Sequence, residues 1–321
     1  MDLANVLLIG GSGFVGGWIA SRLSESGVRV TIPTRHRENT KKLITLPTVE
    51  MVEADVHEPA TLVQLMRGQD AVINLVGILH DGDSRLPYGK GFAAAHVELP
   101  RKIVAAMPQA GVRRLLHMSA LQAALGAPSE YLRSKGDGEM LVRAAKEQID
   151  VTIFRPSVIF GPGDAFLNMF ASLVRLLPVL PLGGGSARFQ PVYVGDVAAA
   201  FVDSLGDRTT FGRSYDLCGP KVYSLRELVD YTAHLVGRSP WIIDLGTGGW
   251  AYLQAGVMWL LPKPPLSPDN LRSMEVDSVT DGTHDFPGWQ PQALEAVAPG
   301  YLSPAEIPQL RFDRYRFRAG R

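Results

Sequence analysis

Apolar residues follow two alternating patterns along the first two thirds of the chain. Short continuous apolar runs predict buried strands, and segments with apolar residues three and four positions apart predict helices. Strands are expected at Val6–Ile9, Val28–Pro33, Val49–Glu53, Ala71–Val76, Arg114–Met118 and Val151–Phe154, and helices at Gly16–Ser26, Ala60–Met66, Ala93–Gln109 and Tyr131–Gln148. This alternation predicts an α/β fold with a doubly wound parallel sheet.

The pattern changes after Gly161, where prolines and the glycine run Gly183–Gly185 interrupt it. A further strand is expected at Gln190–Val194, a helix begins near Asp196, and Ser214–Cys218 is another strand. From there to the end, helical segments alternate with proline-rich loops. These changes indicate a second, smaller and partly interleaved domain.

Composition places the chain among ordinary globular proteins. Of its 321 residues, 46% are hydrophobic, and 32 basic residues balance 32 acidic ones. This balance excludes wholesale disorder and gives no general electrostatic attraction for nucleic acid, so no nucleic-acid partner is expected. The lone Cys218 cannot form an intramolecular disulfide, which fits a reducing, cytoplasmic compartment. The seven histidines show no zinc-ligand spacing, and no metal site is predicted.

A glycine-rich turn joins the first strand to the first helix. It consists of Gly10, Gly11, Ser12, Gly13, Phe14, Val15 and Gly16. Gly10 permits the tight turn, Gly13 lets backbone N–H groups approach a pyrophosphate, and Gly16 lets the helix pack on the strand. The helix N-terminus faces the anion with its partial positive charge. We therefore predict a dinucleotide site here, against the alternative of a plain strand-to-helix turn.

This turn identifies the larger domain as the nucleotide-binding one. A Rossmann domain is expected over residues 1–160, with residues 189–218 returning to it. The smaller domain, for substrate or for an interface, comprises residues 161–188 and 219–321.

The residues after the second strand indicate which dinucleotide binds. A carboxylate there would hold the ribose 2′-OH of NAD, but the chain has Thr34 followed by Arg35, with Arg37 two positions later. An arginine pairs with the 2′-phosphate of NADP. The sequence therefore favours NADP(H) over NAD(H), with Arg35 as the first candidate and Arg37 as the second. The alternative is that both are solvated loop cations.

Two more segments at strand ends belong to the predicted cofactor site. Asp55 and Val56 follow the third strand and would flank the adenine. Leu75, Val76 and Gly77 follow the fourth strand and would run beneath the cofactor, where the glycine allows close approach.

Tyr131 and Lys135 lie four residues apart and therefore on one helix face. A nearby lysine cation favours the phenolate, so we expect the pKa of Tyr131 to lie below its usual value of about 10. Such a tyrosine exchanges a proton with a substrate hydroxyl or carbonyl while hydride moves to or from nicotinamide. The alternative is an exposed tyrosine beside a solvated lysine.

With these motifs the chain resembles the extended short-chain dehydrogenases/reductases, the group that includes nucleotide-sugar epimerases. Further matching stretches are Asp70–Asn74, Arg155–Asp164 and Pro191–Val197, and together they span roughly residues 5–220. An atypical branch, related to the nucleotide-binding accessory subunit of mitochondrial respiratory complex I, resembles the chain more specifically. That likeness rests on Ser129–Lys135, Phe166–Ser172, Gln190–Val194 and Leu266–Leu271.

The resemblance implies a tightly held NADP(H) and a loop beside the nicotinamide that includes Pro156, Ser157 and Val158. Some members of the branch are structural and some are linked to quinone metabolism.

Active relatives also carry a hydroxyl residue after the fifth strand, which orients the substrate oxygen. Ser119 is the candidate for that role, but Ala120 occupies the aligned position. Neighbouring residues on a strand face opposite sides. Without the hydroxyl, Tyr131 would bind the cofactor's ribose and do no chemistry. Ser119, Tyr131 and Lys135 are all expected to contact the cofactor as well, with Lys135 holding the ribose.

The smaller domain is rich in apolar and aromatic residues, above all in residues 241–266, where Trp241, Trp250 and Trp259 lie. This composition suits an apolar substrate or a hydrophobic interface better than a sugar. Residues 311–321 add five arginines interleaved with aromatics, a pattern that suits anionic lipid headgroups. Peripheral attachment to the inner face of a membrane is therefore the alternative to a free cytoplasmic protein, and a transmembrane helix or a signal peptide is not expected. The simpler interpretation is that these segments close the core and form a solvated tail.

Three functions follow. The first is an NADP(H)-dependent oxidoreductase acting on an apolar carbonyl, quinone or lipid-like substrate. The second is a non-catalytic NADP(H)-binding accessory subunit of a respiratory or quinone-related membrane assembly. The third, a sugar-nucleotide epimerase or dehydratase, ranks last because the acidic residue after the second strand is missing and no polar diphosphate site is evident.

Overall fold

The computed structural model describes residues 3–35, 43–83, 85–246, 248–252 and 267–303. The chain divides into two compact units. The first unit comprises residues 1–156, 195–217 and 281–287, and the second comprises residues 157–194, 218–280 and 288–321. The boundary therefore lies four residues before the expected position 160. The returning segment begins at Gly195 rather than at 189, and residues 281–287 return as well.

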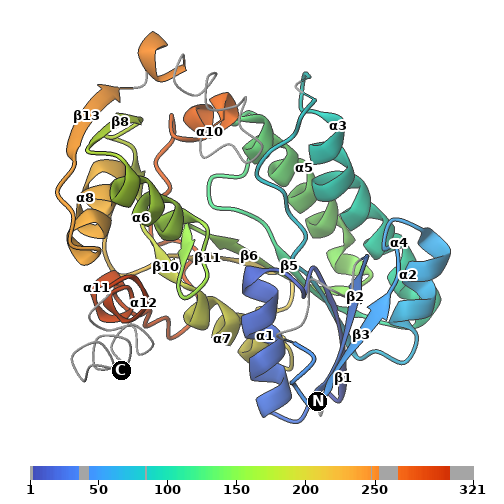
Figure 1. Ribbon diagram of the computed structural model, residues 1–321. Coiled ribbons are helices and arrows are strands. Elements are labelled where there is room, and N and C mark those ends of the chain that lie inside the picture. The colour runs from blue at the N-terminus through green and yellow to red at the C-terminus, as the bar shows by residue number, and fades with distance from the viewer. Residues whose placement is uncertain (1–2, 36–42, 84, 247, 253–266, 304–321) are drawn as a thin grey trace, which may run out of the picture. The chain divides into compact units, whose positions relative to one another are not determined.

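A seven-stranded sheet forms the centre of the first unit, in the order β11-β6-β5-β4-β1-β2-β3 (Figure 1). Every neighbouring pair of strands is parallel. The strands are β1 (Asn5–Ile9), β2 (Arg29–Thr34), β3 (Val49–Glu53), β4 (Ala71–Asn74), β5 (Arg114–Met118), β6 (Asp150–Pro156) and β11 (Arg213–Leu217). The predicted doubly wound parallel sheet is confirmed.

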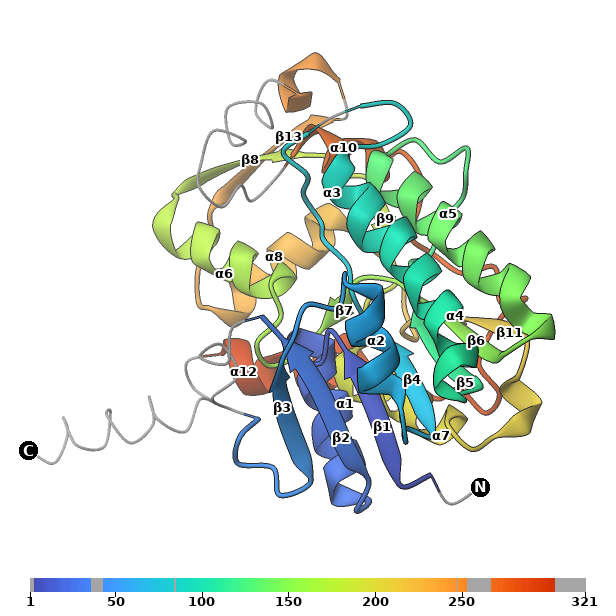
Figure 2. The ribbon, with the colours of Figure 1, turned by 90° about the vertical axis from the view of Figure 1, so that its right-hand side faces the viewer.

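Helices cover both faces of this sheet. They are α1 (Phe14–Glu25), α2 (Pro59–Met66), α3 (Lys90–Phe92), the π-helical turn η2 (Ala93–Glu98), α4 (Leu99–Ala110), α5 (Glu130–Ala144), the short 3-10 turns η3 (Ala145–Glu147) and η4 (Arg208–Thr210), and α7 (Val194–Ser204). Figure 2 shows α2, α4 and α5 along one face, and their apolar sides pack on the strands around Leu7, Ile103 and Ile153. Both faces of the central strands are therefore buried, which explains their continuous apolar runs.

Two predicted helices differ in detail from the structure. The helix expected at Ala93–Gln109 begins with the π-helical turn η2 and ends at Gly111, whose φ of +77° suits a glycine. The helix expected at Tyr131–Gln148 begins after Ser129, whose hydroxyl accepts the Leu132 N–H, and ends at Ala144.

A buried charge cluster fixes α5 to the sheet. The Glu139 carboxylate accepts two hydrogen bonds from Arg155 Nε at 3.0 Å and one from Arg155 Nη2 at 2.5 Å. Asp216, on the neighbouring strand, lies 3.7 Å from Arg155. These contacts hold the pKa of the Arg155 guanidinium above its usual value despite the burial of the group. Because α5 also carries Tyr131 and Lys135, this cluster helps to set the position of the candidate site.

The second unit has its own hydrophobic core, centred on Phe160, Phe170 and Leu228. Its elements are β7 (Ile159–Phe160), α6 (Phe166–Leu176), β8 (Val179–Gly183), β9 (Arg188–Phe189), β10 (Val192–Tyr193), β12 (Tyr223–Ser224), α8 (Leu225–Leu235), β13 (Trp241–Gly246), α10 (Pro268–Ser273), α11 (Leu294–Val297) and α12 (Pro299–Leu302). Within the described residues, no helix is long and apolar enough to cross a membrane.

Candidate functional site

The glycine turn has the geometry of a phosphate cradle. Gly10 has a φ of +83°, which other residues rarely adopt. A Cβ on Gly16 would lie 2.5 Å from the carbonyl oxygen of Gly11, so the helix and the turn meet with no room for a side chain. Gly13 precedes α1 without any side-chain cap, which leaves the N–H groups of the first helical turn open to an anion.

The glycine turn packs directly on the segment that follows β4. A Cβ on Gly10 would lie 3.1 Å from the Val76 nitrogen, and the Leu75 N–H donates to Ile9. The carbonyl of Val76 accepts a hydrogen bond from Lys135 Nζ at 3.4 Å. The structure therefore brings together two motifs that are more than a hundred residues apart in the sequence.

Lys135 is the most enclosed cation of the candidate site. Its ammonium also donates to the carbonyl of Met118, at 3.1 Å, and a Cβ on Gly77 would lie 3.1 Å from it. Burial lowers the pKa of Lys135 to about 8. Gly77 was predicted to allow close approach of the cofactor. In the structure, the group that approaches Gly77 closely is the Lys135 ammonium.

Tyr131 lies against two other rings. Its ring centroid is 5.6 Å from that of His96 and 6.2 Å from that of Phe92, both with edge-on geometry. Burial raises the pKa of Tyr131 to about 12, whereas we expected Lys135 to lower it. The expectation was wrong because burial removes water from the hydroxyl, and that loss of solvation disfavours the phenolate. The hydroxyl is therefore protonated at neutral pH.

Ser119 presents an unused hydroxyl at the end of β5. The residue is 3% exposed, and its Oγ has no hydrogen-bond partner among the described residues. It directly follows Met118, whose carbonyl holds Lys135. A buried unpaired hydroxyl costs about 1–3 kcal/mol, so this group is free to bind an incoming polar atom. Ala120, at the aligned position, is buried and offers no hydroxyl.

The residues predicted to surround the adenine and its ribose lie at the ends of β2 and β3. Thr34 is buried, and Arg35 is exposed with no ion pair to any described residue. Asp55 Oδ1 accepts the His57 N–H at 2.9 Å, and Val56 packs on the core. Arg37 lies outside the described residues.

The three residues predicted beside the nicotinamide fall on both sides of the unit boundary. Pro156 ends β6 in the first unit, and its carbonyl accepts the Leu121 N–H. Ser157 and Val158 belong to the second unit, where Ser157 Oγ donates to the carbonyl of Ser278 at 2.8 Å. The cofactor contacts of these residues stay a prediction.

Sequence reasoning missed His96, which is buried in the π-helical turn. Its Nε2 accepts the Ile78 N–H at 3.0 Å, and its Nδ1 lies 2.8 Å from Ser134 Oγ. Burial, together with the charge of Lys135, lowers the pKa of His96 to about 2. The one signal in the sequence is a histidine among the small residues that open the predicted helix, and such a histidine is commonplace.

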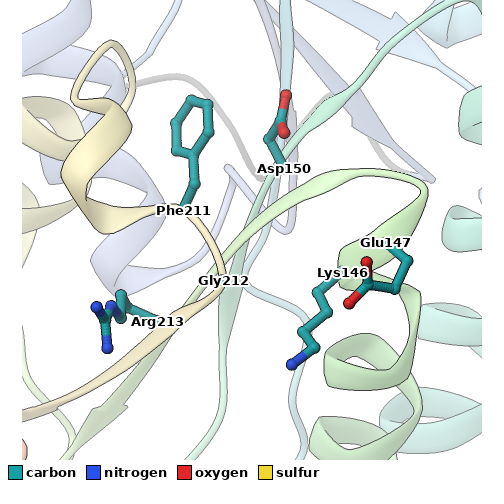
Figure 3. A pocket seen from close by; sticks show the side chains of 6 residues that line it. All are labelled: Lys146, Glu147, Asp150, Phe211, Gly212 and Arg213. Carbon is teal, nitrogen blue, oxygen red and sulfur yellow. The ribbon is translucent and has the colours of Figure 1, made fainter.

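A separate cavity of about 360 Å³ lies at the amino ends of two strands, away from the carboxyl ends that carry the candidate site (Figure 3). It is lined by Lys146, Glu147, Asp150, Phe211, Gly212 and Arg213, at the amino ends of β6 and β11. Ligands of open parallel sheets bind at the carboxyl ends of the strands. The two cations and two carboxylates of this cavity also balance, so it shows no preference for an anion.

Comparison with known proteins identifies the family of the chain. A family model described as NAD dependent epimerase/dehydratase family matches residues 6–217. The mitochondrial NADH dehydrogenase (ubiquinone) 1 alpha subcomplex subunit 9 of Mus musculus is 31% identical over 300 residues, which cover 90% of this chain and 77% of that protein. The match to the subunit of the same name from Arabidopsis thaliana covers 59% of that protein.

Two further likenesses bear on chemistry and fold. A ceramide reductase of Caulobacter vibrioides is 29% identical over 79% of this chain and 76% of its own length. The crystal structure of DesIV, a dTDP-glucose 4,6-dehydratase from Streptomyces venezuelae with NAD and DAU bound, superposes with a TM-score of 0.73. It covers 92% of this chain and 95% of its own, at 20% identity, and it therefore shows the fold alone.

We predict that Gly16→Ala abolishes dinucleotide binding, because the new methyl group would overlap the Gly11 backbone at 2.5 Å. Gly17→Ala is the matched control, since its methyl group would meet only Leu43, at 3.8 Å. That control replaces a helical glycine and should raise the unfolding free energy by about 0.5–1 kcal/mol. Titration calorimetry with NADPH and NADH, together with urea unfolding, measures both effects. Equal cofactor affinity in the two variants would contradict the cradle.

Proposed function

Because this chain belongs to the NAD dependent epimerase/dehydratase family, we propose that it is an NADP(H)-dependent oxidoreductase that reduces a carbonyl group of an apolar, lipid-like substrate. The single observation that carries the proposal is the unpaired Ser119 hydroxyl, buried next to the backbone carbonyl that holds Lys135.

The residues present fit a nicotinamide dinucleotide. The uncapped N-terminus of α1 and the glycine turn would hold the pyrophosphate, and Arg35 would pair with a 2′-phosphate. Lys135, beside Gly77, would donate to the ribose of the nicotinamide half. When bound, the cofactor supplies a hydride.

The protonation state of Tyr131 favours reduction over oxidation. With its pKa raised to about 12, the hydroxyl carries a proton to give at neutral pH. Tyr131 would give its proton to the substrate oxygen as the carbonyl carbon took up the hydride that a bound dinucleotide would supply, so that the carbonyl would become an alcohol. Ser119 would donate a hydrogen bond to the same oxygen, and the cationic form of Lys135 would stabilise the phenolate that remains.

The substrate class rests on two observations. The ceramide reductase relative acts, by its name, on a lipid. The helix α6 in the second unit bears Phe166, Met169 and Leu173, which are only partly buried. Partly exposed apolar side chains suit an aliphatic chain better than a sugar diphosphate.

We predict that Tyr131→Phe lowers kcat by roughly 10²–10⁴-fold, because the variant has no proton to give. Affinity for NADPH should stay nearly unchanged, since the ring and its packing remain. The measurement is stopped-flow oxidation of NADPH with long-chain aliphatic ketones and with a short-tailed quinone as probes. Ser119→Ala should also lower kcat, by less than Tyr131→Phe.

The pH dependence gives a second readout of the same assignment. The cationic form of Lys135 is lost as the pH rises through its pKa of about 8. Reduction should therefore be constant below that pH and fall above it, and Lys135→Arg should remove the fall. Identical turnover in wild type and Tyr131→Phe would sink the mechanism, and so would a rate that rises through pH 8.

For cofactor choice, we predict that Arg35→Gln weakens NADPH binding by roughly 10- to 100-fold, since a charged hydrogen bond contributes about 1.5–3 kcal/mol. NADH affinity should hold steady, because NADH lacks the 2′-phosphate. Arg29→Gln is the control: Arg29 is equally exposed but begins β2 at its other end. Fluorescence titration with both nucleotides gives the ratio of the NADH and NADPH dissociation constants. An unchanged ratio would leave Arg35 a solvated loop cation.

The second candidate function is a cofactor-holding accessory protein at a membrane surface. The observation that favours it is an apolar face of the two-stranded sheet formed by β8 and β13 in the second unit. Trp241 is 78% exposed and pairs with the exposed Val179, and Ile243 lies two residues further on the same face. Tryptophan is the residue that membrane interfaces favour most. Residues 253–266 and 311–321, which the sequence also assigned to this surface, lie outside the described residues.

On this second candidate, we predict that the protein floats with vesicles of phosphatidylcholine and phosphatidylglycerol. Trp241→Ser should weaken that binding roughly ten-fold, because the buried indole area is lost. Leu86→Ser is the control, as Leu86 is 92% exposed in the other unit. Unbound wild-type protein, or an equal loss from both substitutions, would remove the membrane from consideration.

A further inference from the structure

His96 contacts the candidate site through both its ring nitrogens and through ring contact with Tyr131. The residue lies in the π-helical turn η2, with both ring nitrogens hydrogen-bonded. Single π-helical turns inside α-helices occur frequently at functional sites, because they turn a side chain out of the regular helical register. Here the turned side chain meets the ring of Tyr131.

The hydrogen bonds of His96 fix its tautomer. The backbone N–H of Ile78 is always a donor, so Nε2 of His96 accepts and carries no proton. The proton therefore lies on Nδ1, which donates to Ser134 Oγ. The Ser134 hydroxyl in turn donates to the backbone carbonyl of Tyr131, at 2.8 Å. A continuous chain of hydrogen bonds thus runs from the start of the loop after β4 to the backbone of Tyr131.

Packing holds the imidazole on both sides. The Phe92 ring stacks on it at 5.5 Å, and the Tyr131 ring meets it edge-on. Gly138 allows α5 to approach, since a Cβ there would lie 1.9 Å from the carbonyl oxygen of His96. The imidazole therefore has little freedom to move, and neither has the tyrosine ring beside it.

We infer that His96 is a positioning residue for Tyr131: through Ser134 and through ring contact it fixes the orientation in which the phenol meets the substrate carbonyl. The effect of His96 on turnover rests on the proposed function, whereas its effect on the orientation of the Tyr131 ring does not. His96 itself exchanges no proton with the substrate.

The surroundings keep the imidazole neutral. Lys135 and His117 are the titratable groups that act on it, and both disfavour a second proton. A protonated imidazole would also lose the hydrogen bond from Ile78, because Nε2 would then be a donor facing a donor. The hydrogen bonds from Ile78 to His96 and from His96 to Ser134 therefore persist at every physiological pH. Any pH dependence of turnover comes from other groups.

The two hydrogen bonds of the His96 ring, one from Ile78 and one to Ser134, can be removed separately by substitution. His96→Gln places an acceptor near the position of Nε2 and keeps the bond from Ile78, but it loses the donor to Ser134. Ser134→Ala removes the same hydrogen bond, between His96 and Ser134, and leaves the imidazole in place. Both variants interrupt the route through Ser134, and His96→Gln also loses the ring contact with Tyr131. His96→Gln should therefore have the larger effect, and the double variant should add nothing to it. His234→Gln, at an exposed position in the second unit, is the matched control.

The first experiment requires no turnover. In protein labelled with 15N-histidine, the His96 signals, identified by their loss in His96→Gln, are expected to show the neutral Nδ1–H form from about pH 5.5 to pH 8.5. In protein labelled with 13C-tyrosine, the Tyr131 ring signals are expected to shift and broaden in His96→Gln and Ser134→Ala, and to stay unchanged in His234→Gln. The opposite tautomer, a titration within that range, or unaltered Tyr131 signals would overturn the inference.

The second experiment separates positioning from mere support of the fold. His96→Gln and Ser134→Ala should each lower kcat by roughly 10- to 100-fold, the scale of a misplaced catalytic group, with KM and NADPH affinity nearly unchanged. In a Tyr131→Phe background the same substitutions should have no further effect on turnover. Parallel losses of kcat, cofactor affinity and melting temperature would assign His96 to the fold instead. If wild-type protein reduces no probe, the proposed function fails, while the Tyr131 signals still decide the role of His96.

Discussion

The buried ammonium of Lys135 is the interaction on which the rest of the site depends. It donates to the carbonyls of Val76 and Met118, which follow β4 and end β5, so one side chain from α5 joins two adjacent strand ends. A buried ammonium needs its donors satisfied, since an unpaired charge in the interior is very costly. The helix is therefore held at one height along the sheet. Gly77 has no side chain because the ammonium takes that space.

Burial sets the chemistry of every titratable group around that ammonium. It lowers the pKa of Lys135 to about 8 and raises that of Tyr131 to about 12. It also lowers the pKa values of His96 and His117, to about 2 and about 3, with the charge of Lys135 as a second cause. All four shifts favour the uncharged form, as expected where water is excluded. One consequence is a phenol that holds its proton at neutral pH, which is the form that the proposed reduction of a carbonyl requires.

The parts of this structure that could be predicted from sequence are those that local chemistry fixes. Continuous apolar runs gave the six strands of the first part of the sheet, and the glycines at 10, 13 and 16 gave the turn, because each needs a backbone or a close approach that other residues do not allow. The direction of the Tyr131 pKa shift could not be predicted, because it depends on how much protein surrounds the ring. His96 was missed for the same reason, since its partners Ile78 and Ser134 are 18 and 38 residues away.

Whether such a site catalyses a reaction or only holds a cofactor depends on fewer residues than the site contains. The glycine turn, Lys135 and the Tyr131 ring serve both purposes, so their presence does not distinguish an enzyme from an accessory subunit. In the proposed function Ser119 is the group that does, because its buried hydroxyl without a partner stabilises nothing until a ligand reaches it. Retaining that hydroxyl, one residue past the carbonyl that anchors Lys135, is the physical argument for turnover.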